Sequence, residues 1–383
     1  MRKICFITGT RADYGIMAPI MHEIAKSPDA QLQIIATNMH LSQRFGMTVN
    51  EIENDGFSVD VKIDSLIEDD SPEGTVKSMA REMEGLSEAF EKLRPDLVVL
   101  LGDRYEALAA ASAAVVFNIP IVHLHGGETT EGAIDDAFRN AITKLSTYHF
   151  AATLQYAEKI ISMGENPENV FHSGAPGAIP PNTDDELDSL EFYRKTGLQP
   201  YEQFVLLAFH PVTKLDDKGL EELKTTLSAL QAFINQGYKV LVTMPNSDPG
   251  NRRIRETILD WAKLNNEKNK SVVTVESLGA KLFHYAMDNA VAMVGNSSAA
   301  LIEAPTHRLP AINIGYRQKG RAHGLTVIDV PPDQQKIEEA MKAVLSMEMK
   351  AYLMGLSVAS LNPYFKENAA KFIADKIISM NLH

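Results

Sequence analysis

Cysteine is almost absent from this chain, whose 383 residues include a single one, Cys5. A lone cysteine excludes a disulfide bond within the chain and fits a reducing compartment. Because Cys5 lies inside an apolar run, we expect it to be a core residue rather than a nucleophile.

Long apolar runs are also missing. No segment approaches the ~20 apolar residues that a membrane-spanning helix needs. The apolar part of the N-terminal segment is too short for a secretion signal. We therefore predict a soluble cytoplasmic protein that makes no contact with a membrane.

Positive charge is in deficit, with 37 Lys and Arg against 50 Asp and Glu and a formal net charge of −13. Such a surface repels nucleic acids and anionic membranes, so neither is an expected partner. Several familiar motifs are missing too: the phosphate-binding P-loop, G-x-S-x-G and H-E-x-x-H. The glycine spacing after the first apolar run does not match the dinucleotide fingerprint G-x-G-x-x-G.

The chain does contain a regular alternation of short apolar runs and helical segments, from a strand at 4–7 to a final helix at 368–380. This alternation predicts parallel α/β sheets. It is interrupted at 174–186, where glycines, prolines and acids are typical of a linker. We predict an α/β fold of two Rossmann-like, doubly wound domains with a cleft between them, over 1–175 and 182–364.

The stretch 97–136 has a high density of ionisable groups where predicted strands end. Two apolar runs, 97–101 and 120–125, lead into glycine and charge, and an Ala-rich helix separates them. Ligands bind at the carboxyl ends of such strands. The carboxylates here are Asp103, Glu128, Asp135 and Asp136. Close like charges raise the pKa of one carboxyl, so one group can donate a proton while another accepts one; the alternative is that they are helix caps, which suits Asp135.

Histidines follow the same strands. His123 and His125 are two residues apart, which places both imidazoles on one face of a strand. Zinc binding is one interpretation, but no third ligand follows at metal spacing, and we predict no metal. His210 ends a strand in the second half, where a structural, hydrogen-bonded histidine is the plainer interpretation.

Candidate phosphate-binding groups follow other strands. Small residues at 295–298, which are Gly295, Asn296, Ser297 and Ser298, leave N–H groups and hydroxyls available for phosphate at a helix start. The alternative is that a serine here is only an N-cap. Glu303, about two turns on, could accept hydrogen bonds from ribose hydroxyls.

Cations stand at two further strand ends. Arg11 follows the first strand, and the run 315–321 includes Arg317, Lys319 and Arg321. Arginine offers a fork of donors that suits a diphosphate, although an isolated basic run is also typical of a solvated loop. Asn246, in the polar turn after a strand at 239–244, is a further candidate ligand. These residues indicate an enzyme that acts on a nucleotide-linked, phosphorylated ligand by acid–base catalysis.

Seven segments stand in one order along nearly the whole chain: TGTRADYG (8–15), LGDRYEA (101–107), HLHGGE (123–128), FHPVT (209–213), GNSSAALIEAP (295–305), INIGYRQKGR (312–321) and NPYFKEN (362–368). Together they resemble the UDP-N-acetylglucosamine 2-epimerase family, and more closely its hydrolysing branch, which starts sialic acid synthesis. The resemblance implies a GT-B-type fold in which the last helix, 365–383, returns to the first domain. It also implies a homo-oligomer, a dimer or tetramer, and no cofactor.

The resemblance also implies roles for residues. UDP would lie on the second domain, with Ser297 and Ser298 near the diphosphate and Glu303 on the ribose. Arg11 would reach the phosphates from the first domain. His210 matches a family histidine near the diphosphate and the reacting sugar.

The chemistry that the resemblance implies is elimination and rehydration. A base removes the proton from the carbon that bears the acetamido group, and UDP departs to leave a glycal. Water then adds at the anomeric carbon and a proton returns on the opposite face. Asp103 and Asp135 match the family carboxylates for this work, and the products would be UDP and free N-acetylmannosamine.

The chain departs from the family pattern at one position. Some members carry glutamate where this chain has His125, so His125 or its neighbour Glu128 takes that role, or the step runs differently. Histidine is a suitable acid–base group near neutral pH. The lysine that the non-hydrolysing branch has after its arginine is missing, which favours the hydrolysing reaction.

Alternative functions remain open on the sequence. The same chemistry could act on a 2,4-diacetamido-trideoxy hexose linked to UDP or GDP, as in a legionaminic-type pathway. A non-hydrolysing epimerase, a glycosyltransferase of the same fold and a nucleotide-sugar-binding protein without turnover are the others. The acid-rich loop 128–136 argues against the transferase, which would need an acceptor site there.

Overall fold

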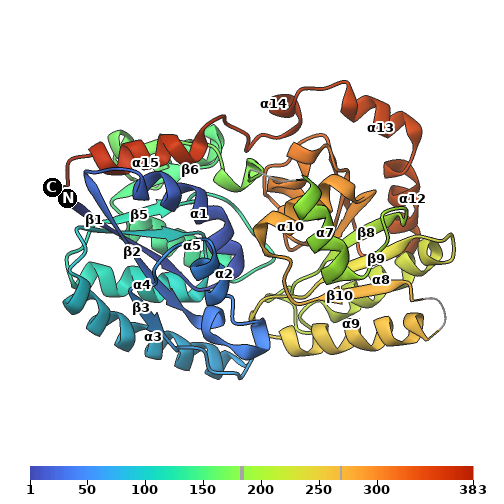
Figure 1. Ribbon diagram of the computed structural model, residues 1–383, viewed down its shortest axis with the longest axis horizontal. Helices are drawn as coiled ribbons and strands as arrows, with labels where there is room; N and C mark the ends of the chain where they lie inside the picture. The colour runs from blue at the N-terminus through green and yellow to red at the C-terminus, as the bar shows by residue number, and fades with distance from the viewer. Residues whose placement is uncertain (182–184, 268–269, 383) are drawn as a thin grey trace. The chain divides into compact units, whose positions relative to one another are not determined.

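The computed structural model describes residues 1–181, 185–267 and 270–382. They form two compact units, each built on one parallel β-sheet (Figure 1). Unit 1 comprises Met1–Glu128, Ile134–Ile179 and the described part of Lys366–His383. Unit 2 comprises Thr129–Ala133 and the described part of Pro180–Phe365.

The sheet of unit 1 has the strand order β3-β2-β1-β4-β5-β6-β7 within the described residues. Its strands are β1 (Arg2–Thr8), β2 (Ala30–Thr37), β3 (Val61–Ile63), β4 (Leu97–Leu101), β5 (Ile121–Leu124), β6 (Tyr148–Ala151) and β7 (Val170–His172). Its helices are α1 (Arg11–Ala25), α2 (Val49–Asn54), α3 (Pro72–Leu93), α4 (Tyr105–Val116), α5 (Asp135–Leu145), α6 (Leu154–Ser162) and α15 (Ala369–Ser379).

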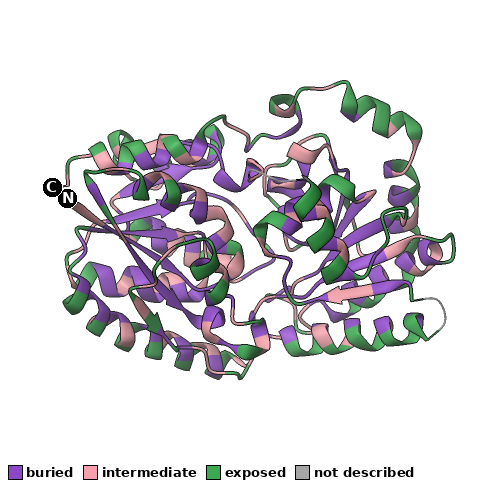
Figure 2. Cartoon of the chain, viewed as in Figure 1, coloured by how far each residue is buried: buried purple, intermediate pink, exposed green. Residues whose placement is uncertain are grey.

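Alternate residues of β1 point to opposite faces of this sheet. Ile4 and Phe6 join an apolar cluster with the buried sides of α1 and α15. Cys5 and Ile7 join a second cluster, with α3, α4 and α5. The sheet is therefore the middle of three layers, and its central strands β4, β5 and β6 are buried along almost their whole length (Figure 2). Cys5 is fully buried, which confirms the prediction of a core residue.

The sheet of unit 2 has the order β10-β9-β8-β11-β12-β13 in the part of the chain that the structure describes. Its strands are β8 (Phe204–Ala208), β9 (Lys239–Thr243), β10 (Val272–Val275), β11 (Ala292–Gly295), β12 (Ala311–Ile314) and β13 (Val327–Val330). Its helices are α7 (Asp185–Thr196), α8 (Leu220–Ile234), α9 (Asn251–Asn266), α10 (Gly279–Asn289), α11 (Ala299–Ile302), α12 (Gln334–Val344), α13 (Met347–Met354) and α14 (Val358–Leu361).

Both strand orders reverse direction at one point, between β1 and β4 in unit 1 and between β8 and β11 in unit 2. Ligands of doubly wound sheets bind outside the carboxyl ends of the strands at such a point. The prediction of Rossmann-like, doubly wound α/β units is confirmed. The turns after β1, β4, β8 and β11 are therefore the places where functional side chains are expected.

Element ends differ from the sequence predictions by a few residues. The strand predicted at 4–7 is Arg2–Thr8, and the final helix predicted at 368–380 is Ala369–Ser379. The predicted linker 174–186 includes residues 182–184, which lie outside the described residues, and α7 already begins at Asp185. No described helix is both long enough and apolar enough to cross a membrane.

A short segment inside the first half of the chain, Thr129–Ala133, groups with unit 2. The amide of Glu131 donates to the carbonyl oxygen of Lys319 at 3.2 Å, and the two side chains form an ion pair at 2.9 Å. A Cβ on Gly132 would lie 2.5 Å from the carbonyl oxygen of Tyr316, so only glycine fits this approach. Sequence patterns give no sign of this pairing, because both segments read as polar loops.

Gly295, the last residue of β11, provides a test of backbone packing. Its φ is +133°, and an added Cβ would lie 2.0 Å from the carbonyl oxygen of Ala208 on the neighbouring strand. Because that oxygen belongs to the sheet, it cannot move aside. Gly295→Ala should lower the free energy of unfolding by about 2–4 kcal/mol in urea denaturation.

Gly237→Ala is the matched control for this prediction. Gly237 has a φ of +99°, but no described atom lies within 4 Å of an added Cβ. This variant should therefore lose only about 1 kcal/mol. Equal losses in the two variants would show that the contact with Ala208 is not the cause.

Candidate active site

The loop after β5 brings an imidazole and a carboxylate together. His125 lies just past the end of the strand with a φ of +62°, a conformation that few non-glycine residues adopt. The chain folds back, and Nδ1 of His125 lies 2.7 Å from Oε1 of Glu128. Both residues are buried. The expectation that His123 and His125 share a strand face is wrong, because β5 ends at Leu124.

The second ring nitrogen of His125 faces no partner. Its Nε2 is buried and has no hydrogen bond within the described part of the chain. A carboxylate at Nδ1 holds the proton on that nitrogen when the imidazole is neutral, which leaves the lone pair on Nε2. The pair His125–Glu128 therefore presents Nε2 as a proton acceptor.

His123 has the opposite character. Its Nε2 lies 2.8 Å from the carbonyl oxygen of Gly102, and its Nδ1 lies 3.2 Å from Oγ1 of Thr143. Burial lowers the pKa of His123 to about 3, so the ring is neutral. Both ring nitrogens are used inside the fold, which makes His123 a structural residue. No three His, Cys, Asp or Glu side chains among the described residues are grouped so that they could hold a metal ion.

A second carboxylate, Asp103 after β4, is held by an arginine. Arg139 of α5 donates to Oδ2 of Asp103, and its Nη1 lies 3.8 Å from Oδ1 of Asp136. The Arg139 side chain is 1% exposed. The sequence prediction missed Arg139, although an arginine four residues after Asp135 falls on the same side of a helix.

Asp135 is the first residue of α5, and Ile134 is the N-cap. The alternative prediction that Asp135 is the N-cap of this helix is therefore wrong. Its carboxylate belongs to the first helical turn, where the helix dipole favours negative charge.

In the turn between β1 and α1, main-chain amides form hydrogen bonds with a side chain of the same turn. Thr10 is the N-cap of α1, and Asp13 closes a capping box with it. The carboxylate of Asp13 accepts hydrogen bonds from the amides of Gly9 at 2.9 Å and Thr10 at 2.8 Å. The turn therefore cannot offer these two amides to a phosphate, and Arg11 is the phosphate-binding candidate that it retains.

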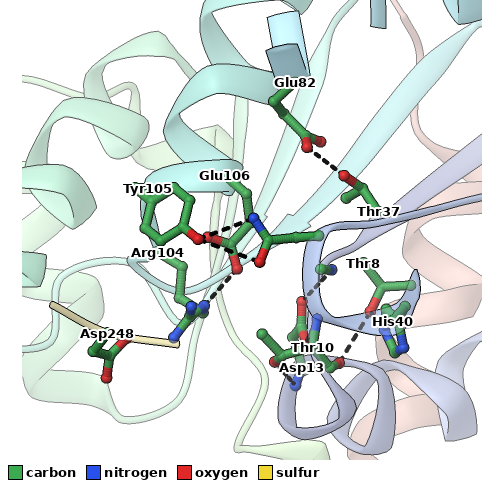
Figure 3. A network of polar contacts seen from close by, with 12 residues as sticks. Thr8, Thr10, Asp13, Thr37, His40, Glu82, Arg104, Tyr105, Glu106 and Asp248 are labelled. Carbon is green, nitrogen blue, oxygen red and sulfur yellow. Dashed lines mark hydrogen bonds and ion pairs between the residues drawn. The ribbon is translucent and has the colours of Figure 1, made fainter. Parts of the chain in front are cut away.

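A network of polar contacts joins residues of β1, β2 and α3 with residues of the turns after β1 and β4 in unit 1 (Figure 3). Its contacts are Thr8–His40 at 3.0 Å, His40–Thr48 at 2.8 Å, Asn38–Tyr105 at 3.0 Å, Arg104–Glu106 at 2.5 Å and Thr37–Glu82. Desolvation by burial raises the pKa of Glu82 to about 8 and also raises the pKa of Glu106. None of these pairs was predicted from sequence. The members of Thr8–His40, Asn38–Tyr105 and Thr37–Glu82 are 32, 67 and 45 residues apart along the chain.

In unit 2, the turns after β8 and β11 are joined by Asn296. Its Oδ1 accepts from the amide of His210 at 2.7 Å, and its Nδ2 donates to the carbonyl oxygen of His210 at 2.8 Å. The carbonyl oxygen of Asn296 accepts from Arg317 at 3.2 Å and from Gln318 at 2.9 Å. Nη1 of Arg321 donates to Oε1 of Gln318 at 3.0 Å. The structure thus brings together four of the residues that the sequence nominated for ligand binding or catalysis.

The serines after β11 differ from each other. Oγ of Ser297 accepts from the amide of Ala299 at 3.3 Å, although Ser297 stands one residue before the N-cap position. Ser298 is the N-cap of α11, but its hydroxyl makes no capping hydrogen bond. Asn246 is half-buried in the turn after β9. Ser298 is therefore the hydroxyl of this turn that is not used for capping.

Glu303 follows α11 as its C-cap residue. Burial raises the pKa of Glu303 to about 7. Its carboxylate makes no hydrogen bond or ion pair with any residue that the structure describes. Such a group is suited to accept hydrogen bonds from hydroxyls of a ligand.

The two doubly wound units define a protein of the GT-B class. A solved structure with a similar fold is the UDP-GlcNAc 2-epimerase from Neisseria meningitidis bound to UDP-GlcNAc, with a TM-score of 0.77 and 19% identity over 99% of this chain and 100% of that chain. Residues 22–378 match the family described as UDP-N-acetylglucosamine 2-epimerase. The chain belongs to this family, and the prediction of an enzyme with epimerase activity is confirmed.

Two relatives are more similar in sequence. The UDP-N,N'-diacetylbacillosamine 2-epimerase (hydrolyzing) of Legionella pneumophila is 37% identical over 90% of this chain and 89% of its own length. The GDP/UDP-N,N'-diacetylbacillosamine 2-epimerase (hydrolyzing) of Campylobacter jejuni is 36% identical over 91% of this chain and 89% of its own length. The resemblance to the hydrolysing branch is confirmed.

Glu82 provides a pH-dependent test of the buried network. Its pKa is raised from 4.5 to about 8, so the folded chain keeps a proton that the unfolded chain releases. The free energy of unfolding therefore falls as pH rises from about 4.5 through about 8. Glu82→Gln removes this charge and should raise Tm at pH 9 by roughly 5 °C, with little change at pH 5.

Glu84→Gln is the control for this test. Glu84 lies two residues away on α3 and is exposed, so its substitution should leave Tm unchanged at both pH values. Differential scanning calorimetry of the three proteins at both pH values makes the comparison. An equal gain for Glu82→Gln at pH 5 and pH 9 would exclude ionisation of Glu82 as the cause.

Proposed function

We propose that this enzyme is a hydrolysing 2-epimerase whose substrate is a 2,4-diacetamido-trideoxy hexose linked to UDP. The observation that carries the chemistry is the pair His125–Glu128, whose unpartnered Nε2 stands at the end of β5. The names of the relatives that are 36% and 37% identical support the diacetamido sugar. The expected products are UDP and the free, epimerised sugar.

The reaction has two halves. A base takes the proton from C2, the bond from C1 to the diphosphate oxygen breaks, and its electron pair leaves with UDP. The resulting glycal has a double bond between C1 and C2. Water then adds its oxygen to C1, and C2 receives a proton on the face opposite to the one that lost it.

Inversion at C2 requires a proton-transfer group on each face of the sugar. Unit 1 supplies two candidates with separate partners: His125 paired with Glu128, and Asp103 paired with Arg139. We assign one of these two groups to each face of the sugar. We assign Glu128 to orienting His125, and Asp135 to the same acid–base set as Asp103.

UDP is assigned to unit 2, assisted by Arg11. Arg317 and Arg321 follow β12 and supply donors for the diphosphate. Ser298 adds its hydroxyl, and Glu303 accepts from the ribose hydroxyls. Donors that hold the leaving diphosphate stabilise the charge that develops as the bond to C1 breaks.

UDP-N-acetylglucosamine is the second candidate substrate. The seven sequence motifs and the description of the matching family support it. The acid–base groups described above act at C1 and C2, so they serve either sugar. With this substrate the free product would be N-acetylmannosamine, for sialic acid-type synthesis.

Product identification in heavy water tests the function. The purified enzyme is incubated with UDP-N,N'-diacetylbacillosamine, its GDP counterpart and UDP-N-acetylglucosamine. We expect free epimerised sugar with one deuterium at C2, and kcat/KM for the UDP-linked diacetamido sugar at least about tenfold higher than for the others.

Each alternative gives a different result in this experiment. Epimerised sugar still attached to UDP would indicate the non-hydrolysing reaction. A product without deuterium at C2 would exclude the elimination. A preference for UDP-N-acetylglucosamine would overturn the choice of sugar while leaving the reaction class intact.

Substitution of the carboxylates tests the assignment of roles. Asp103→Asn and Asp135→Asn should each lower kcat by ~10²–10⁴-fold, because acid–base groups contribute that much. UDP binding, measured by calorimetry, should stay close to that of the parent enzyme. Asp96→Asn is the control, because Asp96 is exposed and lies before β4, at the opposite end from Asp103. Full activity in both active-site variants would refute the assignment.

A further inference from the structure

The side chain of Asn296 is bonded to the main chain of His210 on both sides. The amide of His210 donates to Oδ1 of Asn296 at 2.7 Å, and Nδ2 of Asn296 donates to the carbonyl oxygen of His210 at 2.8 Å. Asn296 has an exposed fraction of 0%. Its amide is therefore oriented by the protein main chain and not by a ligand.

The side-chain amide of Asn296 provides His210 with the main-chain hydrogen bonds that strand pairing does not supply. β11 pairs with β8 as far as Gly295, opposite Ala208. The described pairing of the two strands ends there, so it does not extend to His210. Buried main-chain groups need partners, and the side chain of Asn296 supplies an acceptor and a donor for one residue.

The main chain of Asn296 has a separate task. Its carbonyl oxygen accepts hydrogen bonds from Nη1 of Arg317 and Nε2 of Gln318. Nε of Arg317 also donates to the carbonyl oxygen of Pro211 at 3.3 Å. The side chain thus holds the turn after β8, while the carbonyl group holds the turn after β12.

We propose that Asn296 is a positioning residue that holds His210 for catalysis and acts on turnover rather than on UDP affinity. This rests on the proposed function and on the match of His210 to a family histidine near the diphosphate and the reacting sugar. In this proposal Asn296 does not contact the substrate, whereas the sequence predicted it as a ligand of phosphate.

Asn296→Ala separates the two tasks. It removes the amide but keeps the carbonyl oxygen that accepts from Arg317 and Gln318. Displacement of a reacting group by 1 Å can cost ~10²-fold in rate. We expect kcat to fall by ~10–100-fold, while the Kd for UDP, measured by calorimetry, changes less than ~3-fold.

A double substitution distinguishes action through His210 from direct contact with substrate. In a His210→Ala background, Asn296→Ala should lower kcat by less than ~3-fold further, because residues that act as a unit are not additive. Additive losses, or a loss of UDP affinity as large as the loss of kcat, would overturn the proposal.

Asn313→Ala is the matched control. Asn313 is a buried amide on β12, and it donates to Oδ1 of Asp329 at 2.8 Å. Its truncation removes a similar buried amide from the same sheet without touching His210. We expect its kcat to stay within ~2-fold of the parent enzyme.

Hydrogen exchange at the amide of His210 tests the geometry without any substrate. Asn296→Ala should speed this exchange at least ~10-fold, because the acceptor is lost. Asn296→Asp keeps the acceptor but not the donor, so the amide should stay protected while kcat still falls. Unchanged exchange in Asn296→Ala would overturn the proposal, whereas altered exchange in an enzyme without turnover would refute only the proposed function.

Discussion

Main-chain groups at the carboxyl ends of parallel strands lose their neighbours where the strands stop, and the following turns must supply new partners. In unit 1, Asp13 takes the amides of Gly9 and Thr10. In unit 2, Asn296 takes both main-chain groups of His210. In both turns a polar side chain that resembles a ligand-binding group is used by the fold itself. The Nε2 atom of His125, by contrast, is a buried polar atom with no hydrogen bond within the described residues.

His123 and His125 illustrate this selection within three residues. Both are buried, but His123 has partners for both ring nitrogens, and the Nε2 of His125 has none within the described residues. Burial that lowers the pKa of His123 to about 3 keeps that ring neutral and inert. The carboxylate of Glu128 beside Nδ1 instead orients the other ring. His123 thus has a structural role and His125 a proposed chemical role, and the difference follows from the hydrogen bonds that the fold provides to each ring.

Strands and helices differ from turns in how far their sequence can change while the fold is kept. The fold is shared with a solved structure at 19% identity, because apolar strands and helix faces can be exchanged for others of similar volume. Turns vary more than the strands and helices that they connect, and they carry the polar groups that bind ligands. The pair His125–Glu128 lies in such a turn.

The sequence by itself determined the parallel α/β class and the approximate bounds of most strands and helices, because apolar periodicity is a local property. It also located the polar strand ends that carry Asp103, His125 and His210. Only the tertiary structure showed that Arg139 holds Asp103, because the two lie 36 residues apart and meet across neighbouring elements. The bonds between Asn296 and His210, 86 residues apart, were hidden for the same reason. Which buried polar groups form hydrogen bonds with each other depends on strand order and register, because these bring distant residues together. Local sequence patterns do not predict those pairs.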